Sequence, residues 1–226
     1  MQPYSPAIVA EALLAHLDAA ALARGRATLA IPGGRSPGAV LSALARICTP
    51  FVRERLHLFW LDERAVAPGH AERNDAATLA AWDLGGLRPA GVHPMPAEDA
   101  DLDAAAERYA ATLHQATLGG ALDACLIGLG EDGHLASLFP RHPGLGELST
   151  CFAVRDSPKP PAERLTLSLP VIAQAHLRLV LCLGAAKAWT HQAWRQGSDR
   201  ACPASLLPRQ GTVWYLDDAA VAALPA

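Results

Sequence analysis

Residues 126–134 place a histidine directly after an apolar stretch and a turn rich in glycine. The run reads Leu126-Ile127-Gly128-Leu129-Gly130-Glu131-Asp132-Gly133-His134. Residues 125–127 predict a short buried strand, and the glycines let the backbone approach a ligand closely. Imidazole is the side chain best suited to proton transfer near neutral pH, so His134 is a candidate acid–base group at a strand's carboxyl end. The alternative for this run alone is a glycine-rich turn with a surface histidine.

A second glycine turn, Gly33-Gly34-Arg35-Ser36, lies between a predicted strand and a predicted helix. Its backbone N–H groups can point at an anion, and the positive end of the helix favours negative charge there. Ser36 can donate to a phosphate, cap the helix, or do both. The segment matches neither the P-loop pattern nor Gly-x-Gly-x-x-Gly, so neither a nucleoside triphosphate nor a dinucleotide is expected.

Four cations are candidates for holding an anion through charge-assisted hydrogen bonds: Arg64, Lys159, Arg164 and Lys187. Arg64 and Lys187 follow predicted strands closely, and Arg164 follows a loop able to fold over the site. A lone lysine or arginine is more often solvated surface than ligand, and this alternative applies most to Lys159.

The remaining side chains favour proton transfer over metal or covalent catalysis. No histidine pairs with His134 at a recognised metal-ligand spacing, and Gly-x-Ser-x-Gly, the setting of a serine nucleophile, is absent. What remains is His134 with one or more carboxylates and an arginine. That set suits general acid–base work on a carbonyl.

Predicted strands and helices alternate along the chain. Strands are expected at 28–31, 56–61, 125–127, 151–154, 177–183 and 212–216, and helices begin near positions 5, 36, 74, 101, 185 and 217, with Ser5 and Asn74 as caps. This alternation predicts an α/β fold with a largely parallel sheet and helices on both faces. Ligands of such sheets bind outside the carboxyl ends of the strands. Four predicted strands end in the residues named above, so one composite site is expected.

Composition narrows the class of protein. The chain has 226 residues, 51% of them hydrophobic, and a net charge of −3, so residues 1–226 are expected to form one domain with no basic face for nucleic acid. Its five cysteines contain no Cys-x-x-Cys pair, which indicates a reducing compartment. Neither a signal peptide nor an apolar run of membrane-spanning length is recognised, so a cytoplasmic protein is expected.

These segments resemble the 6-phosphogluconolactonase family. Five motifs follow the family's order and cover nearly the whole chain: Ile31-Pro32-Gly33-Gly34-Arg35-Ser36-Pro37, Trp60-Leu61-Asp62-Glu63-Arg64 with Asn74 downstream, residues 128–140, Ser157-Pro158-Lys159-Pro160-Pro161 with Glu163-Arg164-Leu165-Thr166, and Gly184-Ala185-Ala186-Lys187-Ala188. The Asp-Gly-His and Ser-Pro-Lys-Pro-Pro blocks are the specific ones. Leu135 and Arg35 stand where the family often has threonine and serine.

The resemblance implies a Rossmann-like fold and hydrolysis of 6-phosphoglucono-δ-lactone to 6-phosphogluconate in the oxidative pentose phosphate pathway. His134, Asp62 and Arg64 are the expected catalytic residues. Substrate binding is expected from the glycine turns and the cations: Gly33, Gly34, Arg35, Ser36, Gly130, Asp132, Gly133, Lys159, Arg164 and Lys187. Neither a cofactor nor a metal is expected. The expected partner is a small sugar phosphate, with no nucleic acid and no membrane, and the chain is expected to be a monomer or a small homo-oligomer.

Two other functions remain open at this point. A glucosamine-6-phosphate deaminase or isomerase shares the Gly-Gly, Asp-Glu and Asp-Gly-His elements, but typically continues from its histidine into Asn-Glu-Pro. Here the segment is Ser137-Leu138-Phe139-Pro140, without a carboxylate. A non-catalytic sugar-phosphate sensor on the same fold usually accompanies a DNA-binding helix-turn-helix, for which 226 residues leave no room.

Overall fold

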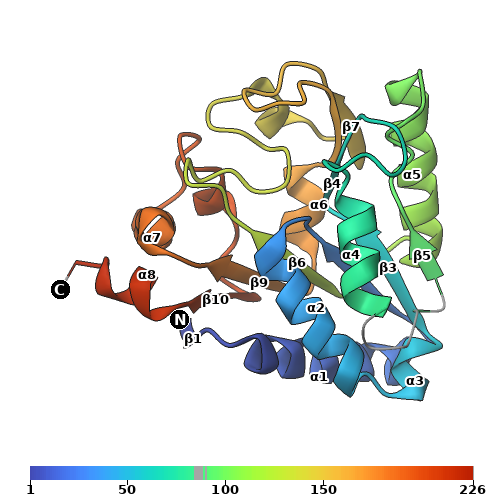
Figure 1. Ribbon diagram of the computed structural model, residues 1–226, viewed down its shortest axis with the longest axis horizontal. Helices are drawn as coiled ribbons and strands as arrows, with labels where there is room; N and C mark the ends of the chain where they lie inside the picture. The colour runs from blue at the N-terminus through green and yellow to red at the C-terminus, as the bar shows by residue number, and fades with distance from the viewer. Residues whose placement is uncertain (84–88, 90, 226) are drawn as a thin grey trace.

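A parallel sheet forms the centre of the molecule (Figure 1). The computed structural model describes residues 1–83, 89 and 91–225, without the side chains of residues 35 and 81–83. Within the described residues this sheet has seven strands, and every neighbouring pair is parallel, as the sequence predicts. In spatial order they are β1 (Gln2–Pro3), β10 (Thr212–Leu216), β9 (Leu177–Cys182), β6 (Ala124–Gly128), β2 (Ala27–Ile31), β3 (Leu56–Trp60) and β5 (Gly91–His93).

Helices connect the strands and cover the sheet. They are α1 (Pro6–Arg24), α2 (Arg35–Ile47), α3 (Pro50–Arg53), α4 (Asn74–Asp83), α5 (Leu102–Ala116), α6 (Leu169–Gln174), α7 (Ala188–Gln196) and α8 (Asp218–Ala222), with short 3₁₀ turns η1 (Pro143–Gly146), η2 (Ala185–Lys187) and η3 (Pro203–Leu206). The helices α1 and α2 contact each other, and α2 also contacts α4. Ser5 caps α1 as expected, since its Oγ accepts from Ile8 N at 3.3 Å and Pro6 occupies the first turn.

Helix α1 corrects one expectation from the sequence. Its 19 residues are long and apolar enough to cross a membrane by length and composition, whereas no apolar run of that length was expected. Core helices of globular proteins have the same length and composition, and here Val9, Leu13 and Leu17 are fully buried in the hydrophobic core. The apolar face of α1 therefore packs against the rest of the protein.

A second, antiparallel sheet begins directly after β3 along the chain, and the sequence does not predict it. Its strands are β4 (Asp62–Arg64), β8 (Arg164–Leu167) and β7 (Cys151–Val154). Residues 62–64 were expected to end the preceding strand as a turn, and residues 151–154 to continue the alternating pattern. Leu61 explains the change of direction: its N–H donates to Ile31 O and its carbonyl accepts from Leu167 N, both at 2.8 Å. The chain thus leaves one sheet and enters the other within a single residue.

Ser36 does not cap α2, which was one of its open roles, and the expected cap of α4 by Asn74 is wrong. The N-cap of α2 is Gly34, at φ 102°, and makes no side-chain bond, so Ser36 lies inside the first turn. Helix α4 begins at Asn74, whose N–H and that of Asp75 donate to the carboxylate of Glu63 at 2.8 and 2.9 Å. A buried carboxylate from β4 therefore caps α4, because it can accept from two free N–H groups at once.

Candidate active site

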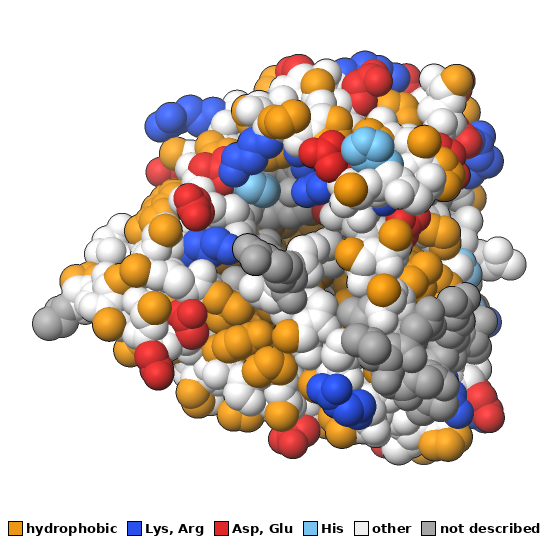
Figure 2. Space-filling model, in the orientation of Figure 1, with side chains coloured by type: hydrophobic (Ala, Val, Ile, Leu, Met, Phe, Trp, Pro, Cys, Tyr) orange, Lys and Arg blue, Asp and Glu red, His pale blue; other side chains and the backbone are white. Residues whose placement is uncertain are grey.

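The carboxyl ends of four adjacent strands, β9, β6, β2 and β3, surround a cleft of about 320 Å³. Figure 2 shows a hollow in this face of the molecule, with lysine, arginine and histidine side chains along its rim. The lining residues are Pro32, Gly33, Gly34, Ser36, Pro37, Asp62, Arg64, Asn74, Gly128, Leu129, His134, Ala136, Arg164, Leu181, Leu183 and Lys187. Parallel strands bring their carboxyl ends to one edge, so four chain segments far apart in sequence meet here.

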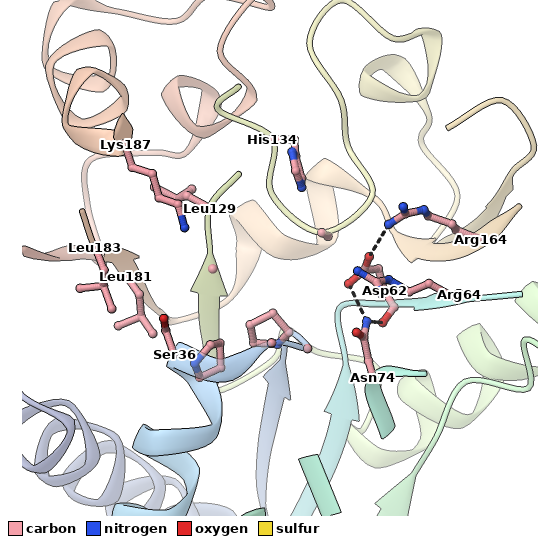
Figure 3. A pocket seen from close by; sticks show the side chains of 16 residues that line it. Ser36, Asp62, Arg64, Asn74, Leu129, His134, Arg164, Leu181, Leu183 and Lys187 are labelled. Atoms are coloured by element: carbon pink, nitrogen blue, oxygen red, sulfur yellow. Dashed lines mark hydrogen bonds and ion pairs between the residues drawn. The ribbon is translucent and has the colours of Figure 1, made fainter. Parts of the chain in front are cut away.

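His134 projects from the turn after β6 into this cleft (Figure 3). Its Nδ1 lies 2.5 Å from Asp132 Oδ1, and its ring packs on Phe139 with centroids 5.0 Å apart. A Cβ on Gly130 would fall 2.0 Å from His134 Nδ1, so glycine is required at that position. Because the carboxylate of Asp132 accepts from Nδ1–H, Nε2 is the nitrogen with a free lone pair, and it remains available to a ligand.

Lys159 contacts both Asp132 and His134 and is not part of the cleft lining. Its Nζ is 3.2 Å from Asp132 Oδ1 and 3.4 Å from His134 Nδ1. Burial lowers the pKa of His134, Asp132 opposes this shift, and the positive charge of Lys159 adds to it. Burial alone would raise the pKa of Asp132, but His134 and Lys159 hold it below its usual value. The arrangement favours a neutral imidazole beside an ionised carboxylate, which is the state of a general base.

Asp62 presents a fixed carboxylate to the same cleft. It is 5% exposed, and its Oδ2 accepts from Ser137 Oγ at 2.7 Å and lies 3.9 Å from Arg164 Nη1. Asn74 Nδ2 donates to the backbone carbonyl of Asp62 at 2.9 Å and lies 3.4 Å from Oδ1. A carboxylate held from three sides keeps one orientation, so Asp62 can align a hydroxyl or a water molecule in the cleft.

Arg64 and Arg164 differ in how many of their donors are already used. Arg164 donates Nε to Pro161 O at 3.1 Å and Nη2 to Lys159 O and Pro160 O at 2.9 and 3.1 Å. These hydrogen bonds hold residues 159–161, in the loop before β8, at the wall of the cleft. Arg64 lines the cleft and donates Nη1 to Glu72 O at 2.8 Å, its one guanidinium hydrogen bond among the described residues. Its Nε is buried, so Nη2 is the nitrogen that Arg64 can offer to a ligand.

Lys187 and the start of α2 form the opposite side of the cleft. Figure 3 shows Lys187 and Ser36 on one side, Asp62, Arg64 and Arg164 on the other, and His134 between them. Among the described residues, no side chain pairs with the amine of Lys187. Gly184, at φ 91°, turns the chain before Lys187, and its N–H donates to the carboxylate of Asp217 at 2.9 and 3.0 Å. A free ammonium beside a helix N-terminus is a setting for an anion such as phosphate.

The structure brings eight of the predicted site residues to the cleft lining: Gly33, Gly34, Ser36, Asp62, Arg64, His134, Arg164 and Lys187. Gly130, Asp132, Gly133 and Lys159 are outside the lining and support the turn of His134. Arg35 begins α2, but its side chain lies outside the described residues. Asn74 and Ser137 hold Asp62, yet neither was selected as a site residue from sequence. Both residues lie in motifs of the family resemblance, which gave no role to either, and nothing local to Ser137 indicates a partner 75 positions away.

The fold and the cleft together define a class: α/β proteins with a small-ligand cleft at the carboxyl edge of a parallel sheet, here lined by a histidine, a carboxylate and three cations. The chain belongs to the family described as glucosamine-6-phosphate isomerases/6-phosphogluconolactonase, whose model matches residues 6–215.

Individual relatives agree with this assignment. The chain is 37% identical to the 6-phosphogluconolactonase of Mycobacterium tuberculosis, over 99% of this chain and 97% of the relative. It is 38% identical to that of Streptomyces coelicolor, over 96% and 91%. The fold matches the crystal structure of 6-phosphogluconolactonase from Thermotoga maritima with a TM-score of 0.84, at 22% identity over 96% of this chain and 97% of that one.

Proposed function

We propose that this protein hydrolyses 6-phosphoglucono-δ-lactone to 6-phosphogluconate. The observation that carries the proposal is the pairing of two functions in one cleft. A histidine–aspartate base faces the cleft from the turn after β6, and an unpaired lysine beside the N-terminus of α2 faces it from the other side. A sugar lactone phosphorylated at its far end needs both. The names of the relatives support the same substrate.

In the proposed reaction, neutral His134 accepts a proton at Nε2 from a water molecule as the water oxygen bonds to the lactone carbonyl carbon. The carbonyl oxygen takes up negative charge, and we assign its stabilisation to Nη2 of Arg64, which lines the cleft. The bond between that carbon and the ring oxygen then breaks. His134 returns its proton to the ring oxygen, which becomes the hydroxyl of the open-chain acid.

Binding and orientation are assigned to the remaining groups. Lys187, Ser36 and the first N–H groups of α2 hold the phosphate, because no other described cation in the cleft has its charged group unpaired. Asp62 accepts a hydrogen bond from a sugar hydroxyl or from the attacking water. We assign Arg164 a structural role in the wall of the cleft, since its donors already bind three backbone carbonyls.

The test is a lactonase assay with the rate of spontaneous hydrolysis subtracted. We expect an excess rate on freshly prepared 6-phosphoglucono-δ-lactone that EDTA does not remove, and no ammonia release from glucosamine 6-phosphate. A rate on glucosamine 6-phosphate alone would replace the proposal by its deaminase rival. Binding of both compounds without turnover of either would favour the sensor.

A cytoplasmic location is part of the proposal. All five cysteines are free and buried, as expected for a protein kept in a reducing compartment. Fractionation of the native cells, with the protein followed by antibody, tests this expectation.

A further inference from the structure

Trp189 makes a contact that the proposed reaction does not use. It lies in the first turn of α7, two residues after Lys187, and is 41% exposed. Its indole Nε1–H donates to the carbonyl of Glu131 at 3.0 Å. Glu131 belongs to the turn that carries His134. The side chain of Trp189 therefore connects helix α7, which follows Lys187, to that turn.

The ring of Trp189 also fits closely against this turn. A Cβ on Gly133 would come within 3.0 Å of Trp189 Cη2, and Gly133 has φ 81°, so glycine is needed there for space and for conformation. On its other side, Gly133 O accepts from Ala204 N at 3.1 Å. The Gly130–His134 turn is otherwise closed on itself by Gly130 N to His134 O and Gly133 N to Gly130 O.

The segment that carries Lys187 is itself held firmly. Lys187 O accepts from Thr190 Oγ1 at 2.6 Å and from Cys182 Sγ at 3.3 Å. The helix side of the Trp189 contact is therefore fixed to β9. Among the described residues, the turn has two other external hydrogen-bond partners, Lys159 Nζ and Ala204 N. Loss of the indole donor would release the turn rather than the helix.

We propose that Trp189 is a positioning residue that fixes the turn of His134 relative to Lys187. It thereby sets the separation between the group that holds the substrate's phosphate and the base that acts on its carbonyl. This inference rests on the proposed function for its consequences in catalysis. The structural part of the inference, that the bond from Trp189 to Glu131 orients His134, does not depend on the substrate.

The test compares Trp189→Phe with Trp194→Phe. Trp194 lies on the same helix, and its indole N–H donates to Leu207 O at 2.9 Å, away from the cleft. In Trp189→Phe we expect kcat to fall by about tenfold, less than the roughly hundredfold that a 1 Å displacement can cost. Affinity for 6-phosphogluconate, measured by calorimetry, should stay within about twofold because the phosphate contacts remain.

A second readout does not require turnover. The ring-nitrogen NMR signals of His134, assigned by their loss in His134→Gln, should shift in Trp189→Phe and stay in place in Trp194→Phe. Unchanged His134 signals would overturn the inference, and so would a parallel fall in affinity, melting temperature and kcat. If the wild-type protein does not hydrolyse the lactone, the proposed function fails, and these signals still decide the role of Trp189.

Discussion

Asn74 Oδ1 occupies the space directly above Gly33, only 1.8 Å from where a Cβ on that glycine would stand. The two residues belong to different motifs and are 41 positions apart in the chain. Asn74 in turn donates to the backbone of Asp62. Through Asn74, the position of the glycine turn after β2 is coupled to that of Asp62 after β3.

This contact predicts a specific effect of Gly33→Ala. The added methyl group must displace Asn74 and, through it, Asp62. We expect a loss of about 1–3 kcal/mol in unfolding free energy, typical of overpacking. We expect kcat/KM to fall by at least about tenfold as Asp62 loses its orientation. Chemical denaturation and steady-state kinetics measure the two effects.

Gly146→Ala is the matched control, because nothing lies within 4 Å of a Cβ at that position. Its stability and activity should stay near those of the wild type, within about 0.5 kcal/mol. An active Gly33→Ala protein with normal stability would contradict the role given to Asn74.

The base assignment predicts that His134→Gln lowers kcat by about 10²–10⁴-fold, the usual contribution of a general acid–base group. His142→Gln is the control, since His142 also pairs with an aspartate, Asp156, at 2.8 Å but lies outside the cleft lining. Circular dichroism checks that both variants fold. Near-normal turnover in folded His134→Gln would move the search for the base to Asp62.

The pH dependence of kcat/KM follows from the charges around His134. Because burial and Lys159 lower the pKa of His134, the acidic limb of the profile should lie below the usual pKa of histidine. Activity is lost as pH falls through that pKa, since the protonated ring cannot accept a proton. Removing the charge in Lys159→Gln should raise the pKa and move the limb to higher pH.

Two companion variants check the sign of this effect. Lys159→Arg keeps the positive charge, so its limb should stay near that of the wild type. Asp132→Asn removes the charge that raises the pKa of His134, so its limb should move to lower pH while kcat falls. A limb that moves in the same direction in Lys159→Gln and Asp132→Asn would refute this electrostatic account.

Phosphate binding is expected to depend on Lys187. Loss of one charge-assisted contact costs about 1.5–3 kcal/mol, which corresponds to a rise of roughly 10- to 150-fold in KM. The change in kcat should be smaller, because the contact exists in both ground and transition states. Arg195→Met, which removes an exposed cation at the other end of α7, should leave KM unchanged. An equal KM for Lys187→Ala and the wild type would remove Lys187 from the phosphate site.

Much of the architecture was predictable from local patterns. Apolar runs such as 177–183 and glycines directly after them identify buried parallel strands and their carboxyl ends, and both depend only on neighbouring residues. Because parallel strands share one edge, placing His134, Asp62 and Lys187 after three such strands was enough to expect them in one cleft. The resemblance of five motifs to the 6-phosphogluconolactonase family indicated the substrate.

The tertiary structure alone decided what each side chain contacts within that cleft. Residues 62–64 form a strand because Arg164 and Thr166 lie opposite them in register, a partner about 100 positions away that no local pattern reveals. Thr166, opposite Asp62, accepts from Ser137 N at 3.3 Å, and Ser137 Oγ donates to Asp62. Arg164, on the same strand, donates to the loop carbonyls. Glu63, on the strand opposite, replaces Asn74 as the cap of α4. Sequence periodicity records which face of an element is buried, whereas hydrogen-bond partners depend on distances between elements, and only the folded chain fixes those.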